Sequence, residues 1–363
     1  MIKPDKSITD EIEAERPSYP SGLLSKQEKD RLIERGLVGL YRWYLARSQR
    51  KRNWNPDYSF AWDQFRTDHS PELNTILEGY YAVEQYVPDY TSKTIQMTRE
   101  SYGRSQFQIR WGSEEEKHAD LWLNTVYFSR HRSPRWIEDY QQSLRNDEWP
   151  MPWTDVFHTI FYVVIQERAT QLNYLNTAII ARGESDNPTF ANDADPILAQ
   201  VAQTIAIDEA AHYYFFLEIA RLYLYYYPAQ AIEALFDVIN NFAMPGFDII
   251  PNRAKLGETL YHAGIYGPRQ YTRDVLQVAL NNLGIEDRRA FSRGIKKSRL
   301  VPDPDGNLRD TTNFDLFDYD SVEKAVQKAF GRINKYEQEW GFDKIAPTTF
   351  VPSGMTLGPQ KND

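Results

Sequence analysis

Apolar residues recur at helical spacing along most of the chain. The first such stretch begins with a capping box at 25–28 and continues with Leu32, Leu37 and Tyr44, which predicts a helix over about 25–48. The same spacing predicts a helix from an N-cap at Ser70, helices over about 104–130 and 155–181, a helix from an N-cap at Asp195, and shorter helices over about 229–243, 254–265, 270–284 and 321–341.

These helices are not separated by any stretch that reads as a linker. Residues 1–24 lack periodicity, and the last residues are rich in proline and glycine. We therefore expect an irregular arm at 1–24, one helical domain at 25–343 with core helices at about 70–226, and a tail at 344–363.

Two interruptions of the apolar stripes share the pattern Glu-x-x-His. They are Glu115 with His118, and Glu209 with His212. Residues three apart on a helix are neighbours, about 5–6 Å between Cβ atoms, so each pair can hold one metal ion. A single copy is commonly a coincidence, and the first copy also matches a capping box at 113–116, which the helix dipole alone would explain. The apolar run upstream favours a helix already in progress.

Two further carboxylates stand alone on apolar faces. Glu84 continues the stripe of Leu77 and Tyr80, four residues before Pro88, which should bend the helix. Glu78 is a rival that lies off the stripe.

On a later helix, Glu167 interrupts a face that includes Val163 and Tyr174. A carboxylate on a buried face is costly unless it is paired or bound to metal. Together with the two Glu-x-x-His pairs, Glu84 and Glu167 complete the six ligands on four helices that a dinuclear carboxylate site requires. Iron and manganese both accept such ligands, and an aromatic bundle without metal remains an alternative.

Composition narrows the chemistry. The chain has no cysteine, which removes thiolate metal sites, thiol nucleophiles and disulfides. The net charge of −9 argues against nucleic acid as a general partner. The polar N-terminus and the lack of a long apolar run lead us to expect a soluble, cytoplasmic protein without a membrane span.

Two local basic runs stand out against this charge. One contains Arg47, Arg50, Lys51 and Arg52, and the other lies at 288–299. Each is either a solvated helix end or a dock for an acidic partner.

The motifs resemble those of the soluble acyl-carrier-protein desaturases, the stearoyl-type plastid enzymes and their bacterial relatives. That family carries Glu-Glu-Asn-Arg-His, Gln-Glu-Arg-Ala-Thr and Asp-Glu-Lys-Arg-His in this order, and the corresponding segments here are 114–118, 166–170 and 208–212. The segments 54–56 and 243–245 resemble its Trp-x-Pro and Ser-Met-Pro. The resemblance extends from about residue 30 to 300.

The resemblance implies an all-α, ferritin-like four-helix bundle with additional helices. It implies two iron ions, with Glu115 and Glu167 as bridging ligands; the ligand set carried over is Glu84, Glu115, His118, Glu167, Glu209 and His212. It places Thr170 beside the oxygen-binding face, and Asp208 and Trp54 as groups that orient His118 and lie on the electron route.

The activity implied is O₂-dependent formation of a cis double bond in an acyl chain on acyl carrier protein. A ferredoxin-type donor would supply two electrons, and the enzyme would be a homodimer. The acidic carrier could dock on either basic run, and we prefer 288–299. Alternatives are another di-iron oxygenase, such as a hydroxylase or N-oxygenase, and a ferritin-like iron-binding protein.

Some positions depart from the family pattern. Ala210 and Ala211 replace two basic residues, and Gln171 stands where plant members have Phe. These changes do not affect the expected metal ligands. They do mean that the resemblance does not define the acyl pocket or the docking site of the carrier protein.

Overall fold

The computed structural model describes residues 26–285, 299–302, 308–311 and 319–341. The expected arm at 1–24, the tail at 344–363 and most of the basic run at 288–299 lie outside the described residues. The division of the chain into arm, domain and tail therefore stays a prediction.

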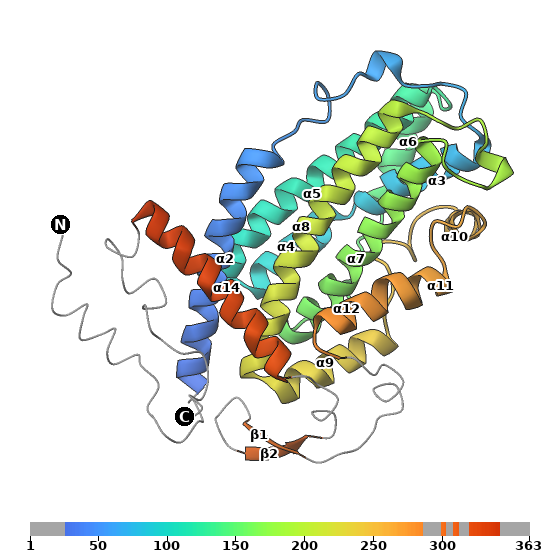
Figure 1. Cartoon of the computed structure of the whole chain (residues 1–363). Coiled ribbons are helices and arrows are strands. Elements are labelled where there is room, and N and C mark those ends of the chain that lie inside the picture. Colours follow the sequence, from blue (N-terminus) through green and yellow to red (C-terminus); the bar gives the residue numbers. More distant parts are fainter. Residues whose placement is uncertain (1–25, 286–298, 303–307, 312–318, 342–363) are drawn as a thin grey trace.

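Four long helices form an elongated bundle at the centre of the molecule (Figure 1). They are α3 (Pro71–Glu84), α5 (Tyr102–Ser129), α7 (Val156–Ala181) and α8 (Pro196–Tyr226). Helix α8 packs most extensively against α7, and α5 packs against α3. Tyr80 on α3 reaches α7, where its hydroxyl group lies 2.8 Å from Thr177 Oγ1. The predicted all-α, ferritin-like bundle with additional helices is confirmed.

Side-chain caps explain why the bundle helices begin where they do. Ser70 accepts a hydrogen bond from the backbone N–H of Leu73, and Asp195 accepts two from the first turn of α8; in both helices a proline follows the cap. Asp155 caps α7 in the same way. Ser101 caps α5 well before Glu115, where the first Glu-x-x-His pair begins, so that pair lies inside the helix and the capping-box alternative for it is wrong.

Helix α3 ends at Glu84, and α4 (Val87–Met97) begins after Gln85 and Tyr86. Pro88 occupies the first turn of α4, where its missing N–H costs nothing. Pro88 was expected to bend one continuous helix, whereas the structure has two separate helices here. This break leaves Glu84 at the end of a helix, inside the bundle.

Further helices cover the bundle on two sides. Helix α2 (Lys26–Lys51) packs on α5 and α8, and α14 (Tyr319–Trp340) crosses α2 and α8 (Figure 1). The remaining elements are η1 (Trp62–Gln64), α6 (Pro134–Leu144), η2 (Pro188–Phe190), α9 (Pro228–Asn240), α10 (Arg253–His262), α11 (Pro268–Gln270), the π-helix η3 (Tyr271–Leu276) and α12 (Gln277–Asn282). Helix α6 was not expected from the periodicity. No described helix combines the length and the apolar character needed to cross a membrane.

One small hairpin was also not expected. Strands β1 (Arg299–Pro302) and β2 (Leu308–Thr311) pair antiparallel, with Arg299 opposite Thr311. Arg299 is the only member of the 288–299 run among the described residues, and the docking role of that run stays a prediction.

Candidate metal centre

The six predicted ligands come together inside the bundle. Glu84 lies on α3, Glu115 and His118 on α5, Glu167 on α7, and Glu209 and His212 on α8. All six are at most 6% exposed. Glu78, the rival to Glu84, instead faces away and pairs with Arg132 at 2.6 Å.

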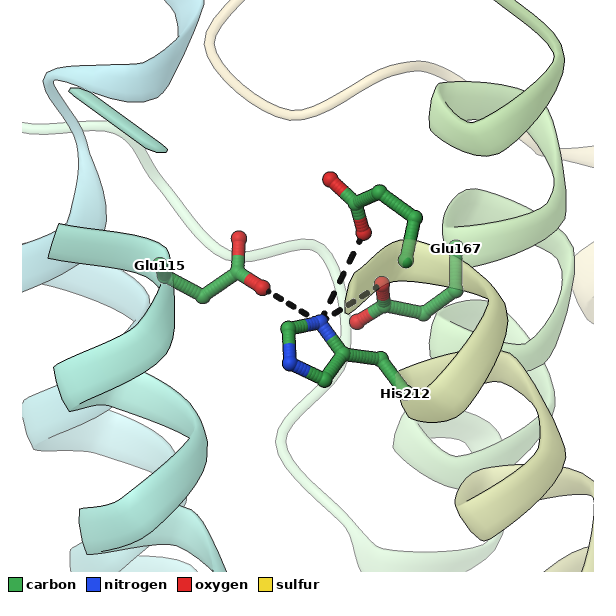
Figure 2. Close-up of side chains that lie close together, drawn as sticks. Glu115, Glu167 and His212 are labelled. Carbon is green, nitrogen blue, oxygen red and sulfur yellow. Dashed lines mark ion pairs between the residues drawn. The ribbon is translucent and has the colours of Figure 1, made fainter. Parts of the chain in front are cut away.

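The donor atoms form two groups. One atom from each of Glu115, Glu167, Glu209 and His212 lies within 4.8 Å of the others, and the same holds for Glu84, Glu115 and His118. Figure 2 shows Glu115 and Glu167 approaching the imidazole of His212 from opposite helices. Glu115 belongs to both groups.

Two carboxylates lie between the imidazoles. Glu115 Oε1 is 2.8 Å from Nδ1 of His212, and its Oε2 is 3.8 Å from Nδ1 of His118. Glu209 shows the same division, with Oε1 3.5 Å from His118 and Oε2 3.6 Å from His212. Glu167 approaches only His212, at 3.5 Å. The structure thus gives Glu209, rather than Glu167, the position between the two histidines.

The atoms that face one another at the centre take part in no hydrogen bond. They are Glu115 Oε1, Glu167 Oε2, both carboxylate oxygens of Glu209, and Nδ1 of His118 and His212. Buried polar atoms are normally hydrogen-bonded, so such a convergence requires another partner. Carboxylate oxygen and imidazole nitrogen are ligands that Fe²⁺ and Mn²⁺ accept, and the residues present fit a pair of such ions.

The carboxylates of Glu167 and Glu84 each accept a hydrogen bond on one oxygen. Trp111 donates its indole N–H to Glu167 Oε1 at 2.9 Å, and Tyr174 donates its hydroxyl to Glu84 Oε1. Each carboxylate therefore keeps its second oxygen for the centre. Tyr174 lay on a predicted apolar stripe, but the contacts of Trp111 and Tyr174 cross between helices and could not be predicted from spacing within one helix.

Nε2 of each of the two histidines, the ring nitrogen that faces away from the centre, lies near a carboxylate outside the six predicted ligands. His118 Nε2 lies 3.5 Å from Asp208 Oδ2, the same oxygen that accepts the indole N–H of Trp54 at 2.9 Å. The Trp54 ring is also nearly parallel to the His118 ring, at 7°. These contacts bring Asp208 and Trp54 against His118, with Nδ1 of His118 left facing the centre. Their place on an electron route stays a prediction.

Glu114 is the counterpart of Asp208 that the sequence analysis missed. Its Oε2 lies 2.9 Å from His212 Nε2, and it also accepts hydrogen bonds from Tyr44 and Ser48. The signal was available: an acidic residue precedes both Glu-x-x-His pairs, and each orients the histidine of the other pair.

Arg52 also departs from expectation. The basic run at 47–52 was interpreted as a solvated helix end or a dock, and Arg47, Arg50 and Lys51 are indeed exposed. Arg52 is 8% exposed, and its Nη1 lies 3.2 Å from both Glu114 Oε2 and Asp208 Oδ1. For Arg52 both interpretations are wrong, because its guanidinium points inward.

Burial and mutual repulsion shift the protonation of the centre. Desolvation, with the charges of Glu115 and Glu209, raises the pKa of Glu84 to about 8. Burial likewise raises the pKa of Glu209, with Glu115 and Glu167 adding to it. For Glu115 burial acts in the same direction, but the two imidazoles outweigh it and lower its pKa to about 2. The metal-free centre therefore holds protons that bound ions would displace.

This protonation predicts how the stability of the metal-free protein depends on pH. Glu84 has a folded pKa above its ordinary 4.5, so the folded state keeps a proton that the unfolded state loses between pH 4.5 and about 8. The pKa values of His118 and His212 are also raised, because nearby carboxylates outweigh desolvation, and act with the same sign above 6.5. We expect the melting temperature of chelator-treated protein to fall by several degrees from about pH 5 to 8.

Circular dichroism melts across this range measure the effect. Saturating Fe²⁺ under anaerobic conditions serves as the comparison, because metal binding releases the protons and its affinity grows with pH. A melting temperature of the metal-free protein that rises steadily from pH 5 to 8 would contradict this protonation of the centre.

A cavity of about 380 Å³ adjoins the centre. Its polar lining residues include Glu84, Glu115 and Thr170; its walls are mainly apolar and include Val163, Met244, Phe247, Leu256 and Leu260. The Thr170 hydroxyl donates to carbonyl oxygens of its own helix, at 3.1 Å to Glu167, and its lone pairs remain for a guest. Met244 belongs to the segment that resembles Ser-Met-Pro, so that motif forms part of the cavity wall.

Comparisons with known proteins agree with the motifs. The family model described as fatty acid desaturase matches residues 63–300. The putative acyl-acyl-carrier-protein desaturase DesA1 of Mycobacterium tuberculosis is 23% identical over 239 residues, covering 64% of this chain and 67% of that protein. The chloroplastic stearoyl-acyl-carrier-protein 9-desaturase 6 of Arabidopsis thaliana is 27% identical over 203 residues, covering 51% and 49%.

A solved structure is also similar. The X-ray structure of the putative acyl-ACP desaturase DesA2 from Mycobacterium tuberculosis H37Rv superposes with a TM-score of 0.49 at 18% identity, covering 72% of this chain and 98% of that one.

Proposed function

The chain belongs to the fatty acid desaturase family, and from this premise we propose that it is an O₂-dependent di-iron desaturase that forms a cis double bond in an acyl chain carried on acyl carrier protein. One observation carries the proposal: six buried carboxylate and imidazole groups converge beside an apolar cavity, and five of them direct an atom without a hydrogen-bond partner toward the others. A metal centre of this kind, opening onto space for a hydrocarbon chain, suits oxidation of an unactivated C–H bond.

The ligand assignment follows the distances. His118 and Glu84 would hold one ion, and His212 and Glu167 the other. Glu115 and Glu209 would contribute to holding both ions, since each directs one oxygen toward each histidine. Manganese remains an alternative to iron on ligand chemistry.

A bound pair of irons supplies the reduction of O₂ that removes hydrogen from the chain. The overall reaction converts two adjacent CH₂ groups, O₂, two electrons and two protons into a cis CH=CH unit and two molecules of water. The protein binds the acyl chain in the apolar cavity, excludes bulk water and places two adjacent carbons beside Glu84 and Glu115. Thr170, on the cavity wall, would hold or pass a proton there.

The electrons must enter from outside the cavity. Trp54, Asp208 and His118 form a connected series of contacts that leads from a partly buried indole to the centre. We assign this series as the entry route from a ferredoxin-type donor. The homodimer implied by the resemblance stays a prediction.

Product analysis tests the reaction. Acyl carrier proteins bearing saturated chains are incubated with iron-loaded protein, O₂ and a reducing system, and their masses are measured. Desaturation predicts a loss of two mass units. Gain of the mass of one oxygen atom would replace this function by that of a hydroxylase, the second candidate, because the same centre and cavity serve both reactions.

A third outcome would favour a ferritin-like iron-binding protein. In that case Fe²⁺ would be oxidised repeatedly by O₂ while every acyl carrier kept its mass. The apolar cavity beside the centre argues against it, since storage of iron requires no space for a hydrocarbon.

A further inference from the structure

A single guanidinium joins the two halves of the centre. Arg52 follows the last residue of α2, and its Nη1 lies 3.2 Å from Glu114 Oε2 on α5 and 3.2 Å from Asp208 Oδ1 on α8. Its side chain is 8% exposed, and those of Glu114 and Asp208 at most 1%. Charge pairs at this burial hold their geometry strongly, because an unpaired buried carboxylate is costly.

Both carboxylates act on a histidine of the opposite helix. A carboxylate oxygen of Glu114 on α5 lies within hydrogen-bond distance of Nε2 of His212 on α8. In the same way, Asp208 on α8 contacts Nε2 of His118 on α5. A carboxylate in this position selects the ring tautomer with hydrogen on Nε2 and leaves Nδ1 for a metal. Arg52 therefore touches the orienting groups of both histidines.

The sequence around the second pair explains why a cation from elsewhere is needed. The motif there is Asp-Glu-Ala-Ala-His, with Ala210 and Ala211 where the family carries Lys and Arg. Both alanines line a second cavity, of about 520 Å³, and Arg52 lines the same cavity. Ala210 and Ala211 on α8 and Arg52, just after α2, thus border one space, in which a long basic side chain from α8 would have room.

Lys117, in the first pair's motif, does not occupy this place. Its ammonium group donates to the backbone carbonyl oxygen of Arg52 at 3.3 Å and lies 4.2 Å from the centre of the Trp54 ring. It therefore holds the segment that carries Arg52 and Trp54.

We propose that Arg52 is a positioning residue that replaces the missing basic residue of the second motif and balances Glu114 and Asp208 together. The inference rests on the two-metal centre of the proposed function. It predicts that one substitution just after α2, outside the four-helix bundle, weakens binding at both metal positions at once.

The test uses R52M, which removes the charge and the hydrogen bonds while keeping an apolar side chain of similar length. Fe²⁺ and Co²⁺ affinities are measured by chelator competition, and the visible absorption of bound Co²⁺ reports the ligand geometry. We expect the affinity of R52M for metal to be about 10–100-fold weaker at both positions of the centre. In contrast, E114Q should weaken the ion at His212, and D208N the ion at His118.

Rescue distinguishes positioning from general destabilisation. A211R places a guanidinium in the same cavity from α8, so the double variant R52M/A211R should regain most of the affinity and the Co²⁺ spectrum. R47M is the matched control: Arg47 lines this cavity, is exposed and stacks on Trp43 at 4.3 Å, and its loss should leave both affinities unchanged.

Several results would overturn the inference. They are unchanged binding of both ions by folded R52M, weakening at one ion only, or a loss that A211R does not reverse. If R52M does not fold, as judged by circular dichroism, R52Q takes its place, because it also lacks the charge but keeps a polar side chain. Failure of the wild-type protein to bind two ions would instead refute the proposed function itself.

Discussion

Replacing Glu115 with alanine is expected to weaken metal binding strongly and to abolish the reaction. Glu115 is the only one of the six ligands that belongs to both donor groups, and it lies 2.8 Å from His212 and 3.8 Å from His118. Its loss removes one oxygen ligand from each ion. Iron content should fall from about two ions per chain to fewer than about one, with no detectable desaturated product.

The matched control is E116A. Glu116 is the next residue on α5 but is exposed, so its substitution removes the same charge from the same helix and leaves the centre intact. Colorimetric iron analysis and circular dichroism are applied to both variants. A folded E115A protein that keeps two irons would show that the ions bind at a site that does not include Glu115.

Enlarging Val163 to phenylalanine is expected to separate substrate binding from metal binding. Val163 lies on α7 one turn before Glu167, is 4% exposed and lines the apolar cavity. A phenyl ring at this position reduces the length of the cavity that is left for the acyl chain. Turnover of long-chain acyl carriers should fall about 10–100-fold while both irons remain bound, and shorter chains should be affected less.

The control here is I179F, on the same helix but 37% exposed. It adds a ring to the surface and should change neither iron content nor chain-length preference. Equal loss of activity for all chain lengths in V163F, or no loss at all, would show that the acyl chain does not occupy this cavity.

The buried groups proposed as metal ligands could be found in the sequence because most of them conflict with their local pattern. A carboxylate on an apolar helix face needs a partner, and Glu84, Glu167 and Glu209 all stood out for this reason. The same rule separated Glu84 from Glu78, which the structure shows on the outer side of α3 with Arg132. Helical periodicity was sufficient here, since every ligand projects from a helix.

The groups around the ligands were much less predictable. Glu114 looked like one of three consecutive acidic residues, and Arg52 like the end of an exposed basic run. Both are buried only because α2 packs across α5 and α8, a contact between segments far apart in the chain. Spacing within one helix carries no information about such contacts.

The bridging role was assigned to Glu167 by resemblance, whereas distances favour Glu209. The difference lies in orientation: one oxygen of Glu167 is held by Trp111, while both oxygens of Glu209 face a histidine. Motif order cannot reveal which oxygen faces which ion.

The most direct test of the account is the position of the metal ions. Crystals grown anaerobically with Fe²⁺ and measured at the iron absorption edge should show two anomalous peaks, one beside Nδ1 of His118 and one beside Nδ1 of His212, with Glu115 and Glu209 between them. A single peak, or peaks away from these six residues, would contradict the two-ion centre on which the proposed desaturase depends.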